Sequence, residues 1–347
     1  MLGTMLDTPL LVSRILEHAA ERHGGSTVTG FVGDLEPRPV RYDVLASRAA
    51  ATAHALAGLG VRPGDVVGIL SGSRTEVVEA MFALPAMGAV ALPVNVLRSR
   101  EFMLSVLSDN RVSVVLVDPE LLSSALPVAA QLDSLRHLVV VDGQVPPDLG
   151  ELDADVHALE TLLDGQPTAY PWPDLDERSA AAIAYTSGTT GASKGVAYTH
   201  RSIWLHSMQM SMAESAALRS GDTVLTTVPM YHVMSWGLPY AAFMTGAGLV
   251  TARPRPGRVL TTGHDMADLL RTYRPNKMAT TQRSSSADHP SPRPCSTRSS
   301  SVTGSRSCRP TDSPSPAPSR RSRDRTPTPP RPGDAHRCSV RDGSPPE

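Results

Sequence analysis

The stretch IAYTSGTTGASKGVAYTH, residues 183–200, gathers glycine, serine and threonine around a single lysine, Lys194. Lysine is rare in this chain, because the only other one is Lys277, whereas 31 residues are arginine. Short apolar runs flank the loop, AAIAYT at 181–186 and GVAYT at 195–199, and predict two strands joined by a glycine-rich turn. Such a turn points several backbone N–H groups and hydroxyls at one spot, which favours the binding of phosphate.

The spacing of this loop differs from that of the Walker A motif. A Walker A loop has four residues between its first glycine and Gly-Lys, and serine or threonine follows the lysine. Here Gly191 is followed by Ala192, Ser193, Lys194 and Gly195. From composition alone the alternative is a solvent-exposed polar hairpin loop, since clusters of glycine, serine and threonine commonly mark turns.

Several stretches carry a resemblance to one known group of enzymes. YTSGTTGASKG, at 185–195, resembles the signature phosphate loop of the adenylate-forming superfamily, which includes acyl-CoA ligases, luciferases and nonribosomal peptide adenylation domains; Ser193 stands where that pattern usually has proline. VPMYHVMSWGLPYAAFMTGAGLV, at 228–250, is similar to the following block of medium- and long-chain fatty acyl-CoA ligases. GVRPGDVVGIL at 60–70 and the segment 85–122 look like their amino-terminal part, so the resemblance covers residues 9 to about 281.

The resemblance implies a reaction in two steps. The carboxylate of a fatty acid attacks the α-phosphorus of ATP and releases pyrophosphate, and the thiol of CoA then displaces AMP from the acyl-adenylate. Preorganised donors and Mg²⁺ suit the first step, because an anion approaches a polyanion there. The expected small-molecule partners are therefore ATP with Mg²⁺, CoA and a carboxylic acid, and an aryl or amino acid remains an alternative substrate.

The same resemblance assigns residues to this reaction. The β- and γ-phosphates of ATP would be held by Thr186, Ser187, Gly188, Thr189, Thr190, Gly191 and Lys194. His232 would be catalytic, close to the reacting carboxylate, and Tyr231, His232 and Trp236 would line the acyl pocket. Without the surrounding motif, the preferred interpretation of His232 is a partly buried histidine that is hydrogen-bonded at a strand end. No protein ligand for a metal is predicted, and Ser187 lacks the G-x-S-x-G surroundings of a hydrolase nucleophile.

Apolar runs and helical patterns alternate along the first 281 residues, which indicates parallel sheets built from βαβ units. Helices are predicted at 9–23, 42–60, 74–88, 99–110, 119–132, 202–218, 237–244 and 266–274, and strands at 65–70, 89–94, 112–118, 137–142, 181–186, 195–199, 223–229 and 247–252. Residues 143–178 are interpreted as a polar connector. The expected fold class is α/β, the large amino-terminal domain of the acyl-adenylate-forming fold, in which stacked, mostly parallel sheets are flanked by helices.

The segment 282–347 has a different composition from the rest of the chain. It is rich in serine, proline and arginine and contains no leucine, isoleucine, methionine or aromatic residue. Such a segment cannot bury enough apolar surface to offset the entropy of ordering, so we expect a disordered tail after a partial adenylation domain at 1–281. All three cysteines, Cys295, Cys308 and Cys338, lie in this tail at spacings that match no zinc motif.

The family pattern stops where this tail begins. The strand that should follow the helix at 266–274, the Tyr-Gly-x-Thr-Glu segment that closes on adenine and Mg²⁺, and the small domain with the catalytic lysine are not found in the sequence. We interpret the tail as out-of-frame sequence, and the alternative is a genuine basic tail that binds a partner. We therefore expect impaired or absent ligase activity, with non-catalytic phosphate binding or an interaction through the tail as alternative functions.

The sequence also gives expectations about location and macromolecular partners. No secretory signal peptide is visible, and the longest uncharged run, at 81–97, is interrupted by proline, glycine and asparagine, so a cytoplasmic protein without a transmembrane segment is expected. Base stacking by the tail is excluded because it has no aromatic side chain, and no nucleic acid is expected as a partner. Acyl chain length and oligomeric state cannot be predicted from these residues.

Overall fold

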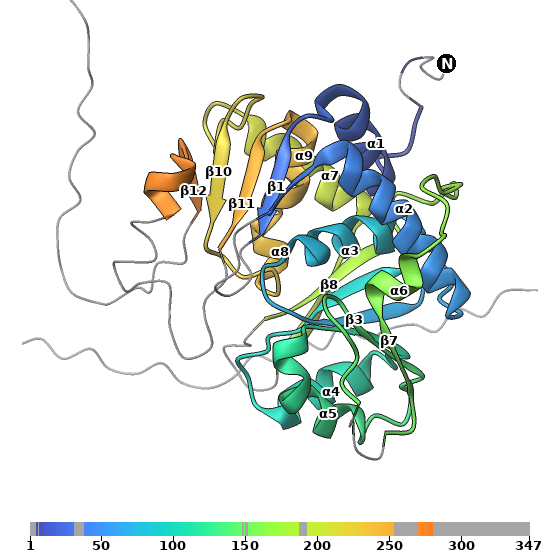
Figure 1. Ribbon diagram of the computed structural model, residues 1–347. Helices are drawn as coiled ribbons and strands as arrows, with labels where there is room; N and C mark the ends of the chain where they lie inside the picture. Colours follow the sequence, from blue (N-terminus) through green and yellow to red (C-terminus); the bar gives the residue numbers. More distant parts are fainter. Residues whose placement is uncertain are drawn as a thin grey trace, which may run out of the picture. The chain divides into compact units, whose positions relative to one another are not determined.

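The computed structural model describes residues 5, 7–30, 38–147, 149, 152–186, 193–252 and 269–279, which form two β-sheets and the helices packed on them (Figure 1). The predicted tail at 282–347 and loop residues 187–191 lie outside the described residues. Within the described part, no helix is both long and apolar enough to span a lipid bilayer.

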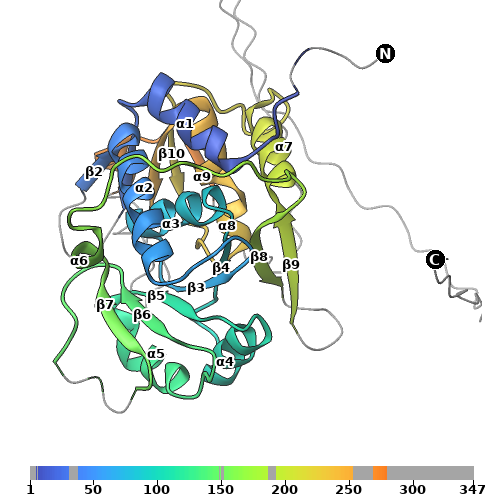
Figure 2. The ribbon, with the colours of Figure 1, turned by 90° about the vertical axis from the view of Figure 1, so that its right-hand side faces the viewer.

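The larger sheet has seven strands. Their order is β7 (Asp155–Ala158), β6 (His137–Val140), β5 (Val114–Val117), β3 (Val66–Leu70), β4 (Val90–Pro93), β8 (Ala180–Thr186) and β9 (Lys194–Thr199). All neighbours pair in parallel except β8 and β9, which form an antiparallel hairpin. The predicted parallel sheet is thereby confirmed, and the glycine-rich loop joins its last two strands (Figure 2).

The smaller sheet has five strands in the order β12 (Lys277–Ala279), β10 (Thr223–Thr226), β11 (Gly248–Thr251), β1 (Thr27–Gly30) and β2 (Arg38–Arg41). Only the pair of β1 and β2 is antiparallel. This sheet joins strands that are distant in sequence, because β1 pairs with β11 in the register Val28 to Leu249.

Helices cover the faces of the two sheets. They are α1 (Val12–His23), α2 (Tyr42–Gly58), α3 (Thr75–Ala86), α4 (Arg100–Asp109), η1 (Pro119–Leu121), α5 (Leu122–Ala129), α6 (Leu159–Leu163), α7 (His200–Ser211), α8 (Val233–Trp236) and α9 (Leu238–Thr245). Helices α1, α2, α3 and α9 lie between the sheets and share one apolar core with both of them (Figures 1 and 2). Helices α4 and α5 cover the other face of the larger sheet, and helical residues 269–273 pack on the other face of the smaller one.

The alternation of buried side chains explains this layering. In β3, Val67 and Ile69 belong to the core between the sheets, whereas Leu70 belongs to the core under α4 and α5. Because successive side chains of a strand point to opposite faces, a strand covered by helices on both sides must be apolar at every position. The Val-rich runs of the sequence satisfy this requirement.

The structure corrects four predictions about individual elements. The connector at 143–178 contains β7 and α6, and β1 and β2 lie where no element was predicted. Helix α7 ends at Ser211 instead of residue 218, because the chain turns back and buries Leu218. The strand that was not found after the helix at 266–274 is present as β12, which pairs in parallel with β10.

Candidate functional site

The structure places both ends of the glycine-rich loop opposite each other. Thr186 ends β8, Lys194 begins β9, and the two residues are cross-strand partners in the hairpin. Both residues are exposed to solvent, and among the described residues Lys194 forms no ion pair. The hairpin therefore presents an exposed ammonium group directly across from a threonine, with no ion-pair partner among the described residues.

Gly195 is required by close packing at this base. A methyl group on Gly195 would lie 3.0 Å from Cε2 of Tyr185 and 3.3 Å from Cγ2 of Ile183. The Tyr185 ring cannot easily move away, because its hydroxyl accepts a hydrogen bond of 2.9 Å from Nδ2 of Asn110. Its ring also meets Phe102 edge to face. The glycine after Lys194 thus allows β9 to lie over the tyrosine ring.

Thr186, the last described residue before the loop, lies at the side of the larger sheet where the carboxyl ends of its parallel strands are. Strand β8 runs parallel to β4, with Ala182 opposite Ala91, so Thr186 lies at the same end of the sheet as the residues that directly follow β3, β5 and β6. In open α/β sheets, ligands bind in the crevice outside the carboxyl ends of the strands. The position of Thr186 is consistent with this rule.

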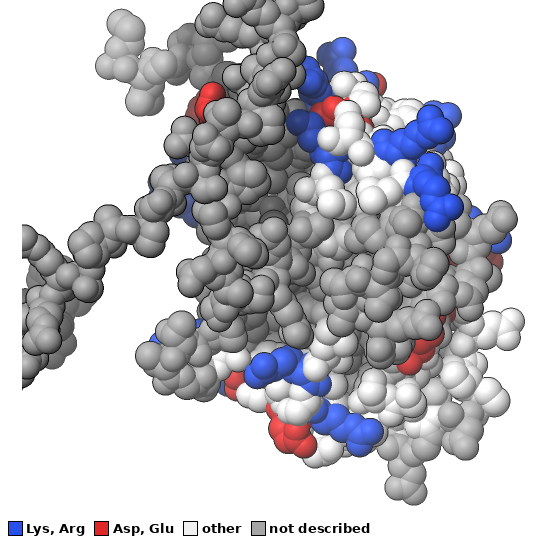
Figure 3. Space-filling view, turned by 90° about the vertical axis from the view of Figure 1, so that its left-hand side faces the viewer, with Lys and Arg blue, Asp and Glu red and all other residues white. Residues whose placement is uncertain are grey.

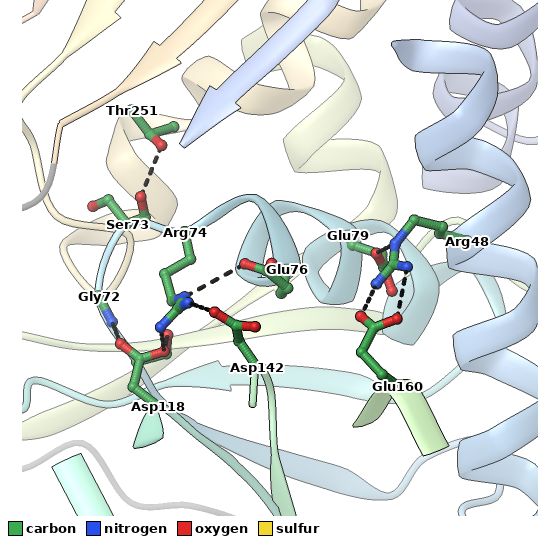
Figure 4. Close-up of polar contacts among 11 residues, drawn as sticks. Arg48, Gly72, Ser73, Arg74, Glu76, Glu79, Asp118, Asp142, Glu160 and Thr251 are labelled. Atoms are coloured by element: carbon green, nitrogen blue, oxygen red, sulfur yellow. Dashed lines mark hydrogen bonds and ion pairs between the residues drawn. The ribbon is translucent and has the colours of Figure 1, made fainter. Parts of the chain in front are cut away.

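A buried arginine connects the neighbouring strand ends at this edge. Arg74 is only 1% exposed, and its Nη1 lies 3.7 Å from Oδ1 of Asp118. Its Nη2 donates a hydrogen bond to Asp142, and its Nε lies 3.5 Å from Oε2 of Glu76, whose pKa is raised by burial (Figure 4). Arg74 follows β3, Asp118 follows β5 and Asp142 follows β6, so one guanidinium group ties three strand ends together.

Asp118 extends this network to the segment after β3. It accepts hydrogen bonds from the Ser71 hydroxyl and, at 2.9 Å, from the backbone N–H of Gly72. Sequence reasoning missed this network. The available signal was an aspartate directly after each of two buried strand runs, VVLVD at 114–118 and LVVVD at 138–142.

The smaller sheet also contacts the segment that follows β3, residues 71–75. The hydroxyl of Thr251, at the end of β11, donates a hydrogen bond of 2.7 Å to the backbone oxygen of Ser73 (Figure 4). A methyl group on Gly30, at the end of β1, would lie 2.6 Å from Oγ1 of Thr75, so only glycine permits this approach. The carboxyl ends of strands from both sheets therefore converge on residues 71–75.

The predicted acyl-pocket residues lie on an unusual turn after β10. Val233, Met234 and Ser235 all have left-handed backbone conformations, with φ of 48°, 51° and 53°, and Gly237 continues at 68°. The turn is held by the Ser235 hydroxyl, which donates to the Val228 backbone oxygen at 2.9 Å. A non-glycine residue in this conformation costs free energy, and the cost is larger for a β-branched residue such as Val233. Residues strained in this way are typical of functional sites.

Tyr231 and His232 directly precede this turn in the sequence. Burial raises the pKa of Tyr231, whereas the His232 side chain is exposed and its backbone N–H donates a hydrogen bond of 2.9 Å to Pro229. The turn labelled α8 contacts β8, the strand that leads into the glycine-rich loop. The structure thus places the segment after β10 beside the strand that ends at Thr186. The side chain of Trp236 and residues 187–191 fall outside the described part.

Comparison with known proteins identifies relatives of this chain. The sequence model of the AMP-binding enzymes matches residues 16–285. The chain is 37% identical over 255 residues to a long-chain-fatty-acid–CoA ligase of Thermus thermophilus, covering 73% of this chain and 45% of that protein. It is 33% identical over 254 residues to a medium-chain-fatty-acid–CoA ligase of Ectopseudomonas oleovorans, covering 73% and 46%. The chain thus spans about half the length of these curated relatives.

Solved structures support the fold. An anthranilate CoA ligase crystallised with anthranoyl-AMP aligns with a TM-score of 0.69 at 22% identity, over 80% of this chain and 51% of that one. A long-chain-fatty-acid–CoA ligase from Archaeoglobus fulgidus aligns with a TM-score of 0.66, over 79% and 52%. The fold that the resemblance implied is confirmed by these likenesses. Together with the family match over residues 16–285, they show that the chain belongs to the family of AMP-binding enzymes.

Proposed function

We propose that this chain carries the phosphate-binding and acid-binding part of an ATP-dependent acid–thiol ligase. In the proposed reaction a fatty acid carboxylate attacks the α-phosphorus of ATP, the bond to the β-phosphate oxygen breaks, and pyrophosphate leaves. The CoA thiol then attacks the acyl carbon and AMP leaves. Membership of the family and relatives named as medium- and long-chain fatty acid ligases support the choice of reaction and substrate.

The observation that carries the proposal is the placement of Lys194. Its side chain is exposed, forms no ion pair with the described residues, and lies across from Thr186 at the carboxyl edge of a parallel sheet. A phosphate oxygen between them would meet an ammonium donor and a hydroxyl donor at once. We assign the same role to the loop residues Ser187, Gly188, Thr189, Thr190 and Gly191. We propose that Mg²⁺ enters together with the phosphates of ATP, and we assign no side chain of this chain as its ligand.

His232 is proposed to act near the reacting carboxylate. Its exposed ring stands at the start of the left-handed turn, and this turn contacts the strand leading to Thr186. A carboxylate held there could approach the α-phosphate while the loop holds the terminal phosphates. Tyr231 and Trp236 are proposed as walls of the acyl pocket, next to the apolar residues that follow on α9.

A second candidate function is nucleotide binding without turnover. It is favoured by the family match, which covers residues 16–285 and leaves the serine-, proline- and arginine-rich residues 286–347 outside it. We propose that residues 1–281 form the partial adenylation domain and that 282–347 contribute nothing to catalysis. In this second candidate the described domain binds the nucleotide, and turnover is small or absent.

The binding of ATP is tested by Lys194→Ala, with Lys277→Ala as a matched control because it removes the only other lysine. Charge-assisted contacts contribute about 1.5–3 kcal/mol, so Lys194→Ala should weaken ATP binding about 10- to 100-fold in calorimetry, while Lys277→Ala leaves it unchanged. Equal affinity of both variants and the parent chain would refute the phosphate-loop assignment.

Turnover is measured separately, as release of pyrophosphate from ATP with CoA and fatty acids of increasing length. ATP binding without pyrophosphate release would support the second candidate. Pyrophosphate release that depends on both Lys194 and the fatty acid would support the complete ligase reaction. Turnover at rates typical of intact enzymes would contradict the expected impairment.

A further inference from the structure

Two histidines and an aspartate meet at the start of the two outermost parallel strands of the larger sheet. Strand β7 runs beside β6 with Asp155 opposite His137 and His157 opposite Val139. Since paired residues of a parallel sheet point to the same face and residues two apart share a face, His137, Asp155 and His157 all lie on one side. None of them takes part in the proposed ligase site, which follows the opposite ends of the strands.

The distances between their ligand atoms are those of a metal site. Nδ1 of His137 lies 3.2 Å from Nε2 of His157 and 3.7 Å from Oδ2 of Asp155, and the three atoms lie within 4.8 Å of one another. In a tetrahedral zinc site, two nitrogens at about 2.0–2.1 Å from the metal are about 3.3 Å apart. The observed nitrogen pair matches that edge of a tetrahedron closely.

The surroundings leave room for an ion. The side chain of Asp155 is 78% exposed and that of His137 is 19% exposed, so an ion can enter from solvent. The nearest arginine in sequence, Arg136, turns its guanidinium toward the backbone oxygens of Asp133 and Leu135 and therefore does not compete for the carboxylate. Among the described residues, this is the one group of three histidine, cysteine or acidic side chains arranged to hold an ion.

We propose that His137, Asp155 and His157 bind a divalent first-row transition-metal ion, with Zn²⁺ as the best-matched species. Two imidazoles and one carboxylate are a ligand set that such ions accept, and three protein ligands leave a fourth position open to water. Strand β7 is the outermost strand of its sheet in the described part, and it is bonded only to β6. The ion would fasten this edge strand by joining side chains of both strands.

The test uses the full chain with Cys295, Cys308 and Cys338 replaced by serine, so that no thiolate can bind metal. Co²⁺ is the spectroscopic probe, because its visible absorption distinguishes tetrahedral nitrogen and oxygen ligands from water. One equivalent of Co²⁺ is expected to bind, to be displaced by Zn²⁺, and to raise the midpoint of thermal unfolding. The competing arrangement is a direct hydrogen bond between the two imidazoles with no metal bound. An unchanged Co²⁺ spectrum would overturn the metal site and favour that arrangement.

Variants decide whether these three residues are the ligands. Loss of an outer partner of a metal ligand already costs about 10- to 100-fold in affinity, so His137→Asn and His157→Asn should each cost at least as much. His18→Gln is the matched control, since exposed His18 also lies beside a second histidine, His23, but no carboxylate of the described residues completes that pair. Equal losses in His18→Gln and His157→Asn would overturn the proposal.

Asp155→Asn keeps the test decisive if a histidine variant fails to fold. Asp155 is mostly exposed, so its replacement leaves the circular dichroism spectrum unchanged while weakening Co²⁺ binding. Unchanged Co²⁺ affinity in a folded Asp155→Asn protein would also overturn the site as described.

Discussion

His200 shows how one residue fixes the contact between two distant segments. It is 1% exposed at the start of α7, and its Nδ1 accepts a hydrogen bond of 3.2 Å from the backbone N–H of Val12, the first residue of α1. Burial lowers the pKa of His200 to about 4, and its Nε2 has no partner among the described residues. Protonation at Nδ1 would place two donors face to face, so this histidine must stay neutral in the folded chain.

The stability of the fold should therefore fall in mild acid. In the unfolded chain His200 takes up a proton near its ordinary pKa of 6.5, whereas the folded chain resists until about pH 4. The contribution of the neutral His200 to stability is complete well above pH 6.5 and is lost as the pH falls toward 4, about 3 kcal/mol in all. His200→Asn, whose Oδ1 can replace the acceptor but cannot titrate, should flatten this slope in urea unfolding between pH 7 and 4.5. An unchanged slope would show that other groups cause the acid sensitivity.

At the scale of elements, an ion-pair network joins three helices near the core. Arg48 of α2 donates a hydrogen bond of 2.7 Å from Nε to Glu79 of α3 and one of 2.6 Å from Nη2 to Glu160 of α6 (Figure 4). Glu79 is 1% exposed, and burial raises its pKa. These contacts fix short α6, and with it β7, against the helices between the sheets.

Removal of the arginine alone should be costly. Arg48→Met leaves the Glu79 carboxylate buried without its cation, and the free energy of unfolding should drop by about 3 kcal/mol. Replacing both, as Arg48→Met with Glu79→Leu, should restore most of it, because no buried charge is left. Arg14→Met is the control: the pair of Arg14 and Glu17 is exposed and should contribute only about 0.2–1 kcal/mol. Urea unfolding measures all four proteins, and similar losses for Arg48→Met and Arg14→Met would contradict the buried network.

At the scale of the molecule, folding depends on contacts between the two halves of the described chain. Strand β1 from the amino-terminal part pairs with β11, and one apolar core runs through both sheets.

On the face drawn in Figure 3, the described basic side chains lie in separate groups with acidic side chains nearby. That face therefore shows no single field of positive charge among the described residues.

The boundary between the domain and the tail is a prediction at the same scale. Because residues 282–347 contain 12 arginines and almost no large apolar side chain, trypsin should cut there first. Mass spectrometry should then find a fragment ending near residue 283 that keeps the helical and strand signal of the intact chain. Cleavage within 42–142 before the tail is removed would contradict this division.

Much of the fold could be predicted from the sequence, for identifiable reasons. Buried strands such as β3, β5 and β6 are short Val-rich runs between helical patterns, and these patterns are local. Strand β7 was missed because its residues, DVHA, have no apolar run and are strand only through pairing with β6. Strand β1 was missed although it pairs with β2 nearby, since its other partner, β11, lies more than 200 residues later. Strand β2, with the residues RPVR, has no apolar run and is paired only with β1 in the described part.

The candidate site, like the fold, could be predicted from the sequence only in part. The sequence by itself determined the family, because residue type and order are all that its motifs require, and phosphate binding by the glycine-rich loop stays a prediction. Only the tertiary structure decided that Arg74 ties three strand ends and that His137, Asp155 and His157 meet. Each of these depends on which strands become neighbours. That choice is made by burial of both faces of the sheets in a shared core, a property of the whole chain that no single stretch contains.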